Sequence, residues 1–136
     1  MALDVRPSPI AGTWYEADPQ ALARSVDRHL DEASLPDLPG EVLGVIAPHA
    51  GHIYSGAVAG HAFAAVRGRS PSVVAVLSPY HNYTESPLLV TSHEAYWTPL
   101  GPVRVARGLL MKLEAELREA GGLPLRPIAH DHEHSL

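Results

Sequence analysis

The chain has 136 residues, which suits a single domain, and it contains no cysteine, so it offers neither disulfides nor thiolate metal ligands. Its formal net charge is -5, and its basic residues form no stripe interleaved with aromatics, so we expect no nucleic-acid surface. No apolar run approaches the ~18 residues of a membrane span, and the N-terminus lacks a signal-peptide layout. These features predict a cytoplasmic protein that makes no membrane contact.

The first predicted element is a helix that begins at Pro19. Asp18 is suited to cap this helix, and proline fits the first helical position. Leu22, Val26 and Leu30 recur every four residues and form an apolar stripe along it. The helix should end at the proline-rich segment 34–40.

Two continuous apolar runs then predict strands that are buried on both faces, as in a parallel sheet. They are VLGVIA at 42–47 and VVAVLS at 73–78. Between them, the small residues of 55–66 predict a helix that packs close to the sheet. Strand, helix and strand would form a βαβ unit, which takes about 30 residues or more.

The rest of the chain predicts further elements of an α/β domain. Segments 88–91 and 102–105 have the pattern of strands, WTPLG at 97–101 that of a turn, and 108–120 that of a helix stopped by two glycines. The final segment is ambiguous. We therefore expect one α/β domain over residues 1–136, with a mainly parallel sheet and flanking helices, and with the fold incomplete.

His49 and His81 are the strongest candidates for metal ligands. Each follows a predicted strand, directly after a proline or one residue later, and they lie 32 residues apart. The carboxyl ends of parallel strands meet at one sheet edge, where ligands bind in α/β proteins. Two imidazoles there could reach one metal at ~2.1 Å each. The alternative is that each is an ordinary solvated loop histidine.

The other histidines have weaker claims. His52 lies on the same predicted loop as His49, where ligation and simple solvent exposure are both open. His29 and His61 fall in predicted helices and His93 in a loop, so we expect structural roles for these three.

The last residues, HDHEHSL, form a third candidate group. Asp131, His132, Glu133 and His134 offer carboxylate and imidazole together, as two-histidine-one-carboxylate iron sites require. The alternative is a polar, hydrated tail.

Five recognisable motifs follow one another along the chain. They are AGTWY at 11–15, IAPHAG-x-IYSG at 46–56, SPYH at 78–81, WTPLG at 97–101 and AHDHEHSL at 129–136. In this order they closely resemble the Memo-like family, also called AmmeMemoRadiSam system protein B. The resemblance covers nearly all of the chain and corresponds to the N-terminal half of family members.

The resemblance implies a fold similar to that of the LigB-type class III extradiol dioxygenases, which use non-haem iron at a sheet edge. It also implies that His49 and His81 are metal ligands, with Fe(II) as the cofactor and Zn(II) or copper as alternatives. His134 is the only local candidate for an acid/base group. His52 departs from the family pattern, because a tyrosine is usual there.

Two classes of function follow from the resemblance. One is a metal-dependent, dioxygenase-like oxidoreductase acting on a small molecule, and the other is a non-catalytic peptide-binding or scaffold protein that uses the same cleft. Prokaryotic members are named for association with AMMECR-like and radical-SAM proteins, which are therefore candidate partners. Family members continue beyond the EHSL motif, so we expect this chain to be either a fragment or a shortened member. We expect the third metal ligand to lie beyond Leu136.

Overall fold

The structure is a computed structural model that describes residues 2–129 and 132–136. It contains three helices and five short strands in that part of the chain, and it confirms the predicted α/β class. None of the described helices has the length and apolar character needed to cross a bilayer. The elements are β1 (Val5–Arg6), α1 (Pro19–Asp31), α2 (His52–Ala64), β2 (Leu88–Thr91), β3 (Ala95–Thr98), β4 (Gly101–Arg104), α3 (Arg107–Glu119) and β5 (Leu125–Ile128).

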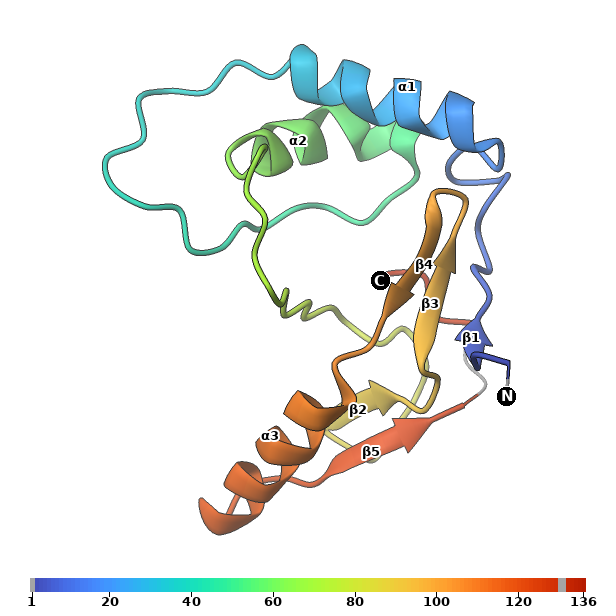
Figure 1. Cartoon of the computed structure of the whole chain (residues 1–136), viewed down its shortest axis with the longest axis vertical. Helices are drawn as coiled ribbons and strands as arrows, with labels where there is room; N and C mark the ends of the chain where they lie inside the picture. The colour runs from blue at the N-terminus through green and yellow to red at the C-terminus, as the bar shows by residue number, and fades with distance from the viewer. Residues whose placement is uncertain (1, 130–131) are drawn as a thin grey trace.

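The strands form two small sheets, shown in Figure 1. One has the order β1-β3-β4, in which β1 pairs parallel to β3 and β3 pairs antiparallel to β4. The other consists of β2 and β5 paired in parallel, with Leu88 opposite Leu125. Parallel pairing therefore predominates, although only modestly.

Helix α1 begins as its sequence predicts. The Asp18 carboxylate accepts a hydrogen bond of 2.7 Å from the backbone N–H of Ala21, and Pro19 occupies the first helical turn. This capping satisfies one of the amide groups that a helix start leaves without a partner. Leu22 is one of two buried apolar side chains in the described chain, together with Ala95 of β3.

Helices α1 and α2 pack against each other, as Figure 1 shows. Gly56 and Gly60 of α2 make this close approach possible. A Cβ atom at Gly56 would collide with the ring of His29, and one at Gly60 would collide with the backbone carbonyl of His29. The small residues of this helix were predicted to pack against a sheet, but they receive α1 instead.

The predicted strands at 42–47 and 73–78 do not form in this structure. Both segments are irregular, and they expose large apolar side chains: Leu43 is 90%, Ile46 98% and Leu77 89% accessible to solvent. A strand needs neighbouring strands for its backbone hydrogen bonds, and neither segment is paired within the described residues. The predicted βαβ unit is therefore wrong for this chain as it stands.

Elsewhere the differences concern element ends and strands with weak signals. Segment 88–91 matches β2 as predicted, and β4 and α3 are each displaced by one residue. Strands β1, β3 and β5 were not predicted, and the motif at 97–101 contributes to a β-hairpin as well as to its turn. Each of these strands has two to four residues, too few to establish a clear periodicity.

His93, in the loop between β2 and β3, joins two parts of the fold. Its Nδ1 lies 2.9 Å from Oδ1 of Asp4, and its Nε2 is hydrogen-bonded to the carbonyl oxygen of Ala129. Both partners are acceptors, so both ring nitrogens must donate, which requires the protonated imidazolium. The hydrogen bond to Asp4, opposed in part by burial, raises the pKa of His93 above its ordinary value.

This arrangement predicts a pH-dependent contribution to stability. Because the folded-state pKa of His93 is raised, its contribution is complete below the unfolded pKa of about 6.5 and is lost as pH rises through the folded value. His93→Gln should lower the free energy of unfolding by about 1 kcal/mol at pH 6, because it removes the charged hydrogen bond to Asp4. The loss is no larger because Asp4 is exposed and water screens the ion pair. Urea unfolding between about pH 6 and 8 should show a flatter profile for the variant. Parallel profiles for the two proteins would contradict the assignment.

The contact between α1 and α2 makes a second prediction. Gly60→Ala should destabilise the protein by about 1–3 kcal/mol, because the new methyl group meets the rigid backbone of His29. Gly108→Ala in α3 is the matched control, since an added Cβ there meets nothing within 4 Å. That control should be neutral or stabilising by up to about 1 kcal/mol. A Gly60→Ala protein as stable as the control would show that the helices separate without cost.

Candidate metal centre

His49 and His81 meet in the structure. Their Nε2 atoms lie 3.3 Å apart and their ring centroids 5.1 Å apart. The predicted convergence is therefore confirmed, although the strands from which it was argued are not formed. Two nitrogen ligands at ~2.1 Å from a tetrahedral metal lie roughly 3.4 Å apart, so this separation suits shared ligation. Metal binding by the pair stays a prediction.

The segment that carries His49 is held from its C-terminal side. The backbone N–H of His52, at the start of α2, donates a 2.8 Å hydrogen bond to the carbonyl of Trp14. Ser55 is buried, and its hydroxyl donates to the carbonyl of Ala50 at 3.0 Å. His49 therefore lies just before a helix start that is attached to the 11–15 turn.

Glu133 holds His81 in place through two hydrogen bonds to the same residue. Its Oε1 lies 2.7 Å from Nδ1 of His81, and its Oε2 accepts the backbone N–H of His81 at 2.6 Å. Ser135 adds a hydrogen bond of 2.6 Å from its hydroxyl to the carbonyl of Pro79. The C-terminal segment is thereby joined to the loop that carries His81.

The Glu133 carboxylate is buried and charged. Its side chain is only 5% exposed, and burial alone would raise its pKa. The hydrogen bonds from the backbone and ring of His81, and from the amides of Ser135 and His134, outweigh that effect and hold the pKa of Glu133 far below its usual range. The group is therefore a fixed negative charge beside the two imidazoles.

His134 completes the cluster. Its ring stacks on that of His81 with centroids 4.4 Å apart, and lies 4.4 Å from the ring of Trp14. Its Nδ1 is buried and has no hydrogen-bond partner among the described residues. Ligand atoms of His81, Glu133 and His134 lie within 4.8 Å of one another, so imidazole and carboxylate donors are concentrated here.

One other predicted candidate, His52, does not join this cluster. His52 is the first residue of α2, and not a loop residue as expected. Its ring packs beside Tyr15 and His29, and its Nδ1 lies 3.7 Å from Oε2 of Glu16. Asp131 lies outside the described residues.

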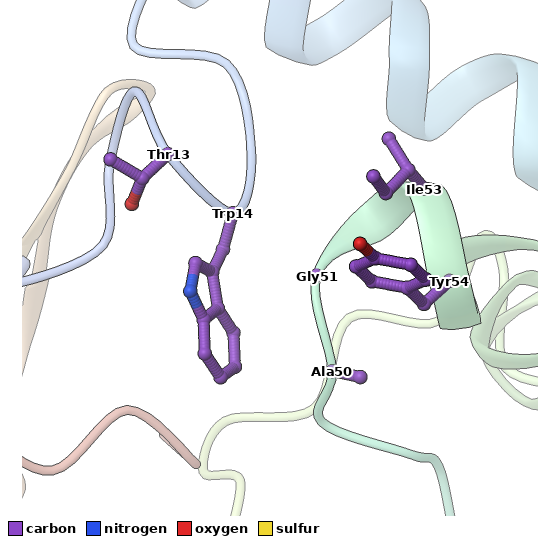
Figure 2. A pocket seen from close by; sticks show the side chains of 6 residues that line it. All are labelled: Thr13, Trp14, Ala50, Gly51, Ile53 and Tyr54. Carbon is purple, nitrogen blue, oxygen red and sulfur yellow. The ribbon is translucent and has the colours of Figure 1, made fainter.

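A cleft of about 290 Å³ adjoins the cluster. Figure 2 shows Trp14 and Tyr54 on its two sides, with Ala50 below them. Trp14 also contacts the ring of His134, so this one side chain borders both the cleft and the imidazole cluster. No role was predicted for Trp14 or Tyr54 from the sequence, although they lie in the family motifs at 11–15 and 46–56. The lining residues are Thr13, Trp14, Ala50, Gly51, Ile53 and Tyr54.

Comparisons with known proteins agree with the motifs. A family profile described as Memo-like protein matches residues 6–136. A MEMO1 family protein of Methanothermobacter thermautotrophicus is 37% identical over 96% of this chain and 49% of its own length. A relative from Methanopyrus kandleri is 34% identical over 93% of the chain and 47% of its own length. The chain spans about half the length of these relatives, and it belongs to the Memo-like protein family.

Proposed function

We propose that the protein binds a divalent transition metal through Nε2 of His49 and Nε2 of His81. The observation that carries this proposal is their 3.3 Å separation, with Nδ1 of His81 already engaged by Glu133. Metal-binding histidines almost always donate the N–H of their second ring nitrogen to a carboxylate, a backbone carbonyl or water in this way.

The donor set supports Fe(II), with Zn(II) or copper as alternatives, because imidazole nitrogen suits all three metals. A non-haem iron site normally uses a carboxylate as well as two histidines. Among the described residues, the ring of His134 lies beside both imidazoles, and its Nδ1 has no hydrogen-bond partner there.

As an enzyme, the protein would be an oxidoreductase related in chemistry to the extradiol dioxygenases. Bound Fe(II) would supply the redox chemistry and the positions for substrate and dioxygen. His49 and His81 would hold the metal, while His134 would accept or donate a proton. The cleft between Trp14 and Tyr54 would seat a small molecule next to these groups.

The cleft also supports a second function, that of a non-catalytic peptide-binding or scaffold protein. Tyr54 is 82% exposed and Ile53 85% exposed, and both line the cleft with Trp14. Exposed apolar surface of this kind often marks a binding site. AMMECR-like and radical-SAM proteins remain candidate partners.

The metal proposal predicts a specific loss of affinity in His49→Ala. Removing one of two ligands should weaken Zn(II) or anaerobic Fe(II) binding by more than the roughly 10–100-fold typical of changes outside the ligand set. His49 is exposed, so circular dichroism should show an unchanged fold. His61→Ala is the matched control, because that exposed histidine of α2 bonds only locally, to the carbonyl of Ala57. Equal affinity in the wild type and His49→Ala would contradict the proposal.

The two functional classes differ in a direct assay. Oxygen consumption by the Fe(II)-loaded protein would support the oxidoreductase. Saturable peptide binding by metal-free protein, lost in Trp14→Ala, would support the binding protein instead.

A further inference from the structure

We infer that Glu133 is a positioning residue for His81 and not a metal ligand. Its carboxylate holds the imidazole in the form that carries its proton on Nδ1, which leaves the lone pair of Nε2 directed at His49. The consequence for metal affinity rests on the proposed function, whereas the assignment of the proton position does not.

The distances separate the two possible roles of the carboxylate. Glu133 Oε1 is 2.7 Å from Nδ1 of His81, the length of a charge-assisted N–H···O⁻ hydrogen bond. Two ligands of one tetrahedral metal at ~2.1 Å would stand roughly 3.4 Å apart. The 3.3 Å between the Nε2 atoms of His49 and His81 fits that value. The metal position therefore lies on the Nε2 side of His81, and Glu133 lies on the other.

The remaining contacts of Glu133 leave its carboxylate little freedom to turn toward a metal. Oε1 also accepts the backbone N–H groups of His134 and Ser135 at 2.8 and 2.9 Å. Oε2 accepts the backbone N–H of His81. The side chain is 5% exposed, and the carbonyl of Glu133 accepts a 2.5 Å hydrogen bond from the buried Arg6 of β1.

This arrangement determines what His81 can do. A neutral imidazole has one donor and one acceptor nitrogen, and an ionised carboxylate can only accept. A neutral His81 must therefore carry its proton on Nδ1, toward Glu133. Nε2 then carries the free lone pair. That lone pair can accept a hydrogen bond from His49 or bind a metal. A carboxylate hydrogen-bonded to the far nitrogen of a metal-binding imidazole also fixes the ring orientation and strengthens metal binding.

A purely structural role for Glu133, as an anchor of the C-terminal segment, makes a different prediction. Ser135 anchors the same segment through its hydroxyl bond to the carbonyl of Pro79. Ser135→Ala removes that bond but keeps the Ser135 backbone N–H and the carboxylate. The two variants therefore distinguish positioning of the ring from attachment of the segment.

The test begins with the unmodified, metal-free protein, labelled with ¹⁵N and observed by long-range ¹H–¹⁵N NMR near pH 8, where ordinary histidines are neutral. His81, identified by the loss of its signals in His81→Ala, should be in the Nδ1–H form. The Nε2–H form, which free histidine prefers, would overturn the inference without any further variant.

Zn(II) titration then tests the consequence. Glu133→Gln preserves size but removes the charge, and it places an amide N–H₂ against at least one donor. It should raise the Kd by about 10–100-fold, whereas Ser135→Ala should leave both the Kd and the proton position of His81 unchanged. Equal Kd values for Glu133→Gln and the wild type, or equal losses in both variants, would overturn the inference. An Nδ1–H form in a wild-type protein that binds no metal would overturn the proposed function and leave the positioning role intact.

Discussion

The geometry of the candidate metal centre depends on the contact between the Glu133 carboxylate and His81. It joins residues 52 positions apart through two hydrogen bonds to one residue. A buried charge is costly unless it is fully hydrogen-bonded, and this one accepts four donors. Displacing it would therefore break four hydrogen bonds at once, which makes the arrangement more rigid than an exposed ion pair.

The two imidazoles converge without the strands that were expected before them, because each histidine is held by contacts to residues elsewhere in the fold. His49 leads into α2, whose start is hydrogen-bonded to Trp14, and His81 is held by Glu133. The segments before them, 42–47 and 73–78, remain irregular and expose large apolar side chains. Their composition still favours strands that are buried on both faces, and such strands form only where neighbours pair with them.

The sequence predictions were most accurate where the signal lay within a few neighbouring residues. Helix α1 was well predicted because Asp18, Pro19 and the stripe through Leu22 act within a few residues. Strand β2 and helix α3 were predicted for similar reasons. Strands β1 and β5 were missed because their two and four residues are too few to establish a clear periodicity. The convergence of His49 and His81 was predicted correctly from their matching positions, but from a strand arrangement that this structure lacks.

The sequence by itself determined the local features: the start of α1, the small residues of α2, the family motifs and the two histidines that each follow an apolar run. Only the tertiary structure decided which chemistry gathers around those histidines. It placed Glu133 behind His81, stacked His134 on the same ring, and set His52 beside Tyr15. These contacts join residues that are distant in sequence, up to 127 positions for Arg6 and Glu133. Local propensity carries no information about such pairs, because their energy arises only when the whole chain brings buried donors and acceptors together.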